Sequence, residues 1–169
     1  MNINFNNINQ HIIPLDQFQL LDGFIDNFLK EHLEQLQPLN NDASKFLWNY
    51  LNHNNVHTDA PFKKDLFQII DKAKVLNGNE KEIKKWLYQR GIPFNKLVYL
   101  SWQPTDAMIV PWKIIIKYFD TFLYYFSDLT IFDESLNWAL LFYHEDEIYF
   151  GTNKKFKPSS SFPDSTFSW

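Results

Sequence analysis

The chain has 169 residues, a net charge of −4, an aromatic content of 18% and no cysteine. A chain of this length fits one domain and can bury about two thirds of the surface that its unfolded form exposes. The absence of cysteine excludes disulfides, thiolate nucleophiles and cysteine-based zinc sites. With only 4 glycines and no G-x-G-x-x-G or Walker pattern, a glycine-rich phosphate loop is not expected.

Charge is segregated along the chain, with a net −5 over residues 1–59, +5 over 60–96 and −6 over 97–151. Acidic blocks of this kind suit a basic partner protein, so we expect neither a membrane nor a nucleic acid as partner. The first residues lack the basic start and continuous apolar core of a signal peptide, and no apolar run reaches the roughly 20 residues of a membrane span. We therefore expect a soluble, cytoplasmic protein.

The first half of the chain is predicted to be helical. Apolar residues recur at three- and four-residue steps from Phe18 to Leu36, which predicts one helix that ends before Pro38. A second helix is predicted from about Asp42, and the polar stretch NHNNVHTD after it indicates a loop.

Two further helices are predicted before the middle of the chain. Asp59 can cap a helix that carries Pro61 in its first turn and continues to Ala73. The stretch NGNE ends that helix and begins a fourth, which RGIP closes with Gly91 in the left-handed conformation.

The second half changes to the period of β-strands. Strands are predicted at residues 96–102, 129–132, 137–143 and 147–150, with a turn at QPTD and a helix over 111–126. We therefore predict an α+β fold, with a helical N-terminal half packed on an antiparallel sheet formed mainly by the C-terminal half. Residues 1–151 are expected to form a single domain, and 152–169 a mobile tail.

The segment His144–Glu147, HEDE, lies between two aromatic strands. Neighbouring strand residues point to opposite faces, so His144 and Glu145 can share a metal ion only if the turn bends them together. Catalytic carboxylates also need partial burial or a charge partner, which a hairpin tip does not supply by itself. The pattern favours a solvated hairpin tip; the alternative is a small hydrolase that uses His144 with Glu145 or Glu147, with or without a metal.

Other candidate sites are equally open to a simpler interpretation. His53 and His57 have the i, i+4 spacing of helical metal ligands, with Asp59 nearby, but the asparagines between them indicate a loop. Ser101 has no G-x-S-x-G setting. We therefore predict no catalytic residue, no metal ligand and no cofactor.

The basic segment 63–90 places lysines beside the apolar face of the fourth predicted helix, which is typical of a solvated surface. The alternative is a nucleic-acid or regulatory adaptor, which would need a broader basic face with exposed aromatic rings.

Acidic side chains gather in two predicted connections, at opposite ends of one strand. Either connection can present carboxylates beside aromatic rings to a lysine-rich protein surface, although an acidic surface without a partner fits the same pattern. We predict six partner-binding residues: Asp133, Glu134, Tyr143, Glu145, Asp146 and Glu147.

The run WKIIIKYFDTFLYYFSDLTIFDESLNWALLFYHEDEIYFG, residues 112–151, resembles small bacterial immunity proteins of polymorphic and contact-dependent growth inhibition toxin systems. The resemblance lies in an acid- or hydroxyl-rich turn, a tryptophan-containing strand and a charged hairpin tip. It implies a non-enzymatic cytoplasmic protein that binds and neutralises a cognate toxin by occluding its active site. Such a toxin is often a basic nuclease whose cleft an acidic surface can occupy.

Overall fold

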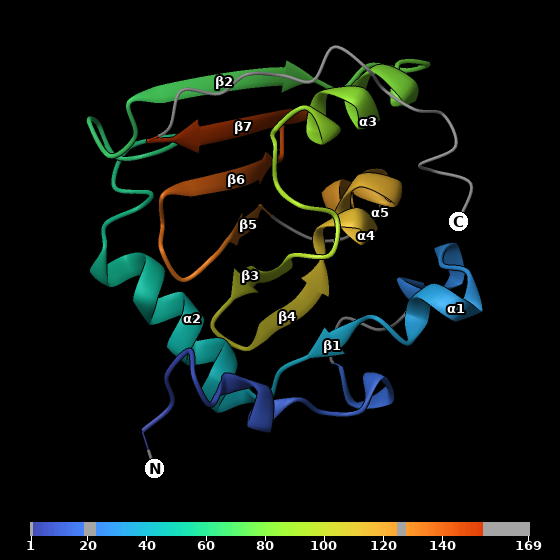
Figure 1. The fold of residues 1–169 in the computed structure, drawn as a ribbon, viewed down its shortest axis with the longest axis vertical. Helices are drawn as coiled ribbons and strands as arrows, with labels where there is room; N and C mark the ends of the chain where they lie inside the picture. Colours follow the sequence, from blue (N-terminus) through green and yellow to red (C-terminus); the bar gives the residue numbers. More distant parts are fainter. Residues whose placement is uncertain (1, 19–22, 125–127, 154–169) are drawn as a thin grey trace.

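Seven strands form one antiparallel sheet through the middle of the molecule (Figure 1). The computed structural model describes residues 2–18, 23–124 and 128–153. The spatial order of the strands is β1-β4-β3-β5-β6-β7-β2. Their bounds are β1 Gln37–Pro38, β2 Ile69–Lys74, β3 Leu97–Gln103, β4 Asp106–Pro111, β5 Leu129–Phe132, β6 Trp138–Tyr143 and β7 Glu147–Thr152.

Short helices cover the sheet, and the predicted α+β class is therefore confirmed. The α-helices in the described ranges are α1 Lys30–Leu33, α2 Asn41–His53, α3 Glu80–Tyr88, α4 Trp112–Lys117 and α5 Phe119–Tyr124. Three 3₁₀ helices precede them, η1 Ile8–His11, η2 Leu15–Gln17 and η3 Ile25–Asn27. The N-terminal half also supplies the two edge strands, β1 and β2.

Apolar side chains cover both faces of the sheet. Figure 1 shows α2 on one side and α4 with α5 on the other. Leu47 of α2 shares a buried cluster with Leu141 of β6, whereas Phe122 of α5 shares another with Leu140 and Phe142. β6 is therefore a central strand covered on both faces, as its continuous apolar sequence predicts.

Several predicted elements are confirmed. The side chain of Asn40 caps α2 by accepting a hydrogen bond of 2.9 Å from the main-chain N–H of Ala43. α3 buries Ile83 and Leu87, and Gly91 beyond its end has a φ of 77°. The predicted strands at 96–102, 129–132, 137–143 and 147–150 correspond to β3, β5, β6 and β7.

The single helix predicted over Phe18–Leu36 is wrong. Within its described part, Gly23 has a φ of 78°, and Phe28 is extended, so only η3 and α1 are helical. Phe24 is fully buried, and its ring centroid lies 5.5 Å from that of Phe122. The three- and four-residue spacing of apolar side chains therefore reflects the burial of an irregular segment. This segment is not a helix, because a glycine and an extended residue interrupt the helical hydrogen bonds.

The helix predicted from Asp59 to Ala73 is also wrong. Residues 54–68 form a connection without regular structure, and β2 follows it. β2 pairs with β7 along its whole length, from Ile69 opposite Thr152 to Lys74 opposite Glu147. The β-branched Ile69 and Ile70 suit an extended strand, and pairing with the distant β7 outweighs the local helical spacing.

The helix predicted over 111–126 is found as α4 and α5, which meet at Tyr118, where a φ of −115° and ψ of 29° interrupt the helical backbone. Residues 125–127 lie outside the described part.

β4, which the sequence pattern does not indicate, has no polar–apolar alternation because residues 106–110 are all buried. The predicted tail, 152–169, lies outside the described residues except for Thr152, which ends β7, and Asn153.

Phe67 fixes the connection before β2 against the sheet. A Cβ atom added to Gly151 of β7 would lie 2.2 Å from Cδ2 of the Phe67 ring. We expect Gly151→Ala to lower the free energy of unfolding by about 1–3 kcal/mol, because the ring or the strand must move. Urea unfolding of a double-mutant cycle tests this contact: the alanine should cost much less in a Phe67→Ala background, and equal costs in both backgrounds would contradict it.

Candidate functional site

The predicted hairpin tip is confirmed, with Tyr143 opposite Glu147 at the ends of β6 and β7. His144 and Glu145 are exposed, and Asp146 has a φ of 60° that turns the chain. No hydrogen bond or ion pair joins His144 to Glu145 or Glu147 in the described part of the chain. His144 instead contacts Asp128 through its main-chain N–H, at 2.8 Å, and through Nδ1, at 3.0 Å. Among the described residues, the carboxylate that contacts His144 is thus that of Asp128.

Lysines of β2 neutralise one flank of the tip. The carboxylate of Glu147 lies 3.6 Å from Nζ of Lys72 and 4.0 Å from Nζ of Lys74, which also donates to the main-chain oxygen of Glu145 at 2.6 Å. The Tyr149 hydroxyl donates to Glu147, and this hydrogen bond, with the lysine charges, lowers the pKa of Glu147. The same bond raises the pKa of Tyr149 to about 12. Glu147 is thus engaged within the protein.

The buried side chain of Asp133 holds the β5–β6 connection through hydrogen bonds. Its carboxylate is 8% exposed and accepts hydrogen bonds from the main-chain N–H of Ser135 and, at 2.9 Å, from the indole N–H of Trp138. Glu134 beside it is exposed, while its main-chain oxygen accepts from the Tyr50 hydroxyl at 2.5 Å. Burial, followed by the charges of Asp133 and Glu134, raises the pKa of Tyr50.

Replacement of Asp133 should therefore reduce stability. We expect Asp133→Ala to cost about 2–4 kcal/mol, because the Trp138 indole and the Ser135 groups lose a charged acceptor. The exposed Glu134→Ala should stay within about 0.5 kcal/mol of the parent. Urea denaturation of the two variants measures this difference, and equal stabilities would show that Asp133 has no structural role.

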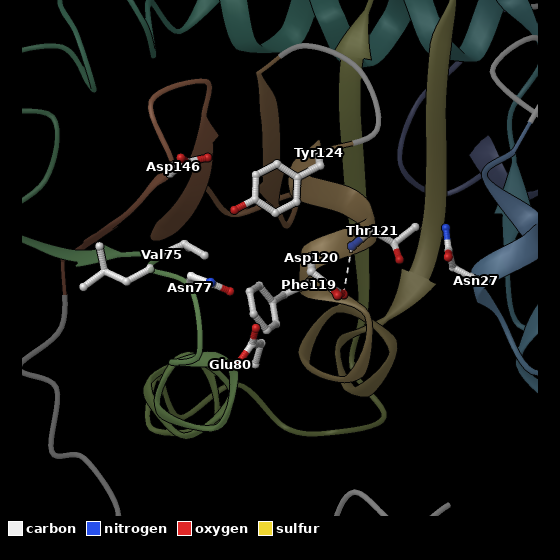
Figure 2. Close-up of a pocket in the computed structure, with 10 residues that line it drawn as sticks. Asn27, Val75, Asn77, Glu80, Phe119, Asp120, Thr121, Tyr124 and Asp146 are labelled. Carbon is white, nitrogen blue, oxygen red and sulfur yellow. Dashed lines mark hydrogen bonds between the residues drawn. The ribbon is translucent and has the colours of Figure 1, made fainter.

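A pocket lined by three carboxylates lies beside the tip, on the face of the sheet that carries α5 (Figure 2). We call it the acidic pocket and define it by Leu76, Glu80, Asp120, Tyr124 and Asp146. Its volume is about 610 Å³. Glu80 begins α3, Asp120 and Tyr124 lie on α5, and Asp146 comes from the tip. Three separate parts of the chain therefore meet here.

The carboxylates of the acidic pocket are free to meet an external cation. Among the described residues, no lysine or arginine forms an ion pair with Glu80, Asp120 or Asp146. Figure 2 shows the Tyr124 hydroxyl turned toward Asp146. Burial of the hydroxyl raises the pKa of Tyr124, and the charge of Asp146 and a hydrogen bond to it raise it further. Tyr124 and Leu76 are nevertheless 59% and 58% exposed, so an aromatic ring and an aliphatic chain stand among the acids.

A second pocket, of about 530 Å³, lies on the face of the sheet that carries α2. We call it the hydroxyl pocket and define it by Trp48, Ser101, Asp128, Thr130 and Tyr143. Tyr143, one of the predicted partner-binding residues, is half-buried there, with its ring centroid 4.1 Å from that of His144. The hairpin tip thus separates two pockets.

His57 fixes the connection 54–68 to the hydroxyl pocket. Its Nδ1 lies 2.7 Å from the carbonyl oxygen of Pro61, and its Nε2 lies 2.7 Å from the hydroxyl of Thr130. Desolvation of the ring lowers the pKa of His57. The hydrogen bond to Pro61 and the charge of Asp128 raise it, but by less. The residue as a whole keeps an exposed surface. The lowered pKa favours the neutral form of the His57 ring. The described residues contain no group of three histidines and acids arranged to hold a metal ion.

Two histidines make the stability depend on pH. Burial also lowers the pKa of His32, whose Nδ1 lies 2.5 Å from the Tyr118 hydroxyl. Both pKa values lie below 6.5 in the folded state, so below about pH 6.5 the unfolded chain binds more protons. Stability should be fully present above that pH and fall below it. We expect urea unfolding between about pH 7.5 and 5.5 to show this loss, and a smaller loss in His57→Gln; an unchanged slope in the variant would contradict it.

The basic side chains of segment 63–90 are distributed over several elements of the fold. Lys72 and Lys74 pair with Glu147, and Arg90 is 6% exposed, with its NH1 atom 2.9 Å from Asp71 and its guanidinium over the Trp86 ring. Lys81, Lys84 and Lys85 lie on α3. The broad basic face required by a nucleic-acid adaptor is therefore divided among a loop, an edge strand and a helix.

The sequence and the structure match no known protein-family model, no curated protein and no solved structure. No helix in the described ranges is both long and apolar enough to cross a membrane. The function is therefore inferred from the geometry of the chain itself.

Proposed function

We propose that the protein binds a basic partner protein at the acidic pocket, as a binding protein and not as an enzyme. The observation that supports this most is the group of three carboxylates, Glu80, Asp120 and Asp146, that have no internal ion pair and surround the exposed Tyr124. Carboxylates without an internal ion pair give the surface a negative potential, which attracts lysine and arginine side chains.

The aromatic ring gives this surface an anchor. Tyrosine is among the residues that contribute most to protein interfaces, because it buries a large rigid ring and keeps a polar end. Leu76 extends the apolar area beside it, and the acids form a charged rim. A partner lysine or arginine in the pocket would pair with the rim while apolar atoms cover Tyr124 and Leu76. Charge pairing of this type raises the association rate and the specificity.

The partner that we propose is a cognate bacterial toxin, and neutralisation is by occlusion of its active site or functional surface in the cytoplasm. The segment that resembles immunity proteins, residues 112–151, supplies three of the five side chains that define the acidic pocket: Asp120, Tyr124 and Asp146. A nuclease suits the proposal, because an enzyme that binds a polyanion needs a basic cleft.

Growth measurements test this function. The product of the gene immediately upstream, expressed alone in a bacterial host, should stop growth, and coexpression with this protein should restore it. The two proteins should also copurify as a complex. A neighbour that does not harm the host, or one that stays toxic when this protein is present in excess, would contradict the proposal.

A further inference from the structure

The hydroxyl pocket presents several hydrogen-bond acceptors, together with the indole N–H of Trp102, which has no hydrogen-bond partner among the described residues. The carbonyl of Pro61 can only accept, so Nδ1 of His57 carries the proton and Nε2 must accept from the Thr130 hydroxyl. The Thr130 proton is thereby directed at His57, and the remaining lone pairs of its Oγ1 are available to another donor. Ser101, the cross-strand neighbour of Thr130, is 2% exposed, and its hydroxyl has no hydrogen-bond partner among the described residues.

A carboxylate adds negative charge at the mouth of the pocket. Oδ1 of Asp128 accepts the two hydrogen bonds from His144, which orient the carboxyl group. Its Oδ2 makes no hydrogen bond or ion pair within the described part of the chain. Trp48 and Tyr143, both half-buried, also line the pocket. Aromatic faces attract cations, with guanidinium groups more often found there than ammonium groups.

We propose that the hydroxyl pocket binds the guanidinium group of an arginine side chain. Two features of the pocket set requirements for a ligand: the free lone pairs of Thr130 and the Ser101 hydroxyl, which accepts as well as donates, call for hydrogen-bond donors, and the nearby carboxylate calls for a cation. Guanidinium meets both requirements, because its planar fork carries five N–H donors and stacks on aromatic rings. The arginine is that of the basic partner, and in this respect the inference rests on the proposed function. The partner would then hold the hairpin tip from both faces of the sheet.

Binding of a small probe by the protein alone tests this site. N-acetyl-arginine methylamide is titrated into the ¹⁵N-labelled protein at constant ionic strength, and the amide signals of Ser101, Thr130 and His144 are followed. We expect saturable shifts at these positions. The citrulline analogue has nearly the same shape without the charge, and it should bind at least about tenfold more weakly. Equal binding of the two probes, or shifts only around Tyr124, would overturn the inference.

Two variants complete the experiment. Asp128→Asn keeps the shape of the side chain and should weaken arginine binding at least about tenfold. Asp42→Asn removes the same charge from an exposed residue that lines neither pocket and should leave binding of the probe unchanged. An unchanged affinity in Asp128→Asn, with the fold intact in its amide spectrum, would overturn the inference. The probe experiment needs no toxin, so it can fail independently of the growth experiment. If the probe binds but the upstream gene product is harmless, only the proposed function is contradicted. If the protein protects growth but does not bind the probe, only this site is contradicted.

Discussion

Neutralising the acidic pocket should weaken binding of the partner about 100-fold, which corresponds to about 2.8 kcal/mol. The variant combines Glu80→Gln, Asp120→Asn and Asp146→Asn, which remove three charges that have no ion pair within the described part of the protein. Each charge pair lost at a partly exposed interface costs about 1 kcal/mol. Most of the change should appear in the association rate, measured by surface plasmon resonance, and it should shrink as salt screens the charges.

A matched variant controls for net charge. Asp16→Asn, Glu34→Gln and Asp42→Asn also remove three negative charges, from exposed residues that do not line the acidic pocket. We expect less than about a threefold change in affinity from this variant, because distant exposed charges are largely screened at physiological salt. An equal loss of binding in both variants would mean that the partner responds to overall charge and not to the pocket.

Replacing Phe24 with alanine should lower the free energy of unfolding by about 3–5 kcal/mol. The ring is fully buried, although it lies in an irregular segment, and its centroid lies 5.0 Å from that of Phe28 and 6.3 Å from that of Trp102. Loss of the ring removes apolar burial and leaves a cavity among aromatic side chains. The linear dependence of stability on urea gives the change directly.

Leu29→Ala is the control for this segment. Leu29 is 50% exposed and lies only five positions beyond Phe24, so its replacement should cost less than about 0.5 kcal/mol. The helix predicted over Phe18–Leu36 would place both side chains on one continuous element. A similar cost for the two variants would contradict the burial pattern of the irregular segment that the structure shows.

The second half of the fold could be predicted because its signals are local. β5, β6 and β7 follow one another with short connections, and acids between two aromatic strands indicate the hairpin tip. The strand β2 could not be predicted in the same way, because its partner β7 lies more than 70 residues further along the chain. Its spacing of apolar residues also fits a helix, and only pairing with β7 decides between the two.

For the candidate site too, the part with a local sequence signal could be predicted and the part formed by tertiary contacts could not. Asp146 was among the residues predicted at the tip, and the structure places it in the acidic pocket. Glu80 and Asp120 carry no local signal, because each is distant in sequence from Asp146, and α3, which carries Glu80, follows the strand β2 that pairs with β7. The same pairing brings Lys72 and Lys74 to Glu147 and so removes that charge from the surface predicted for a partner. Asp128 and Thr130 are likewise joined to His144 and His57 by tertiary contacts alone.

Hydrogen–deuterium exchange of the protein, with and without the product of the upstream gene, tests most directly that the acidic pocket binds the partner. We expect the amides of residues 75–80, 119–124 and 145–147 to exchange more slowly in the complex, because the partner covers the surface that they form. Amides of α2 away from the tip should be unaffected. Protection confined to the exposed side of α2 or to the edge at β1, with no change around Tyr124, would contradict the proposed binding surface.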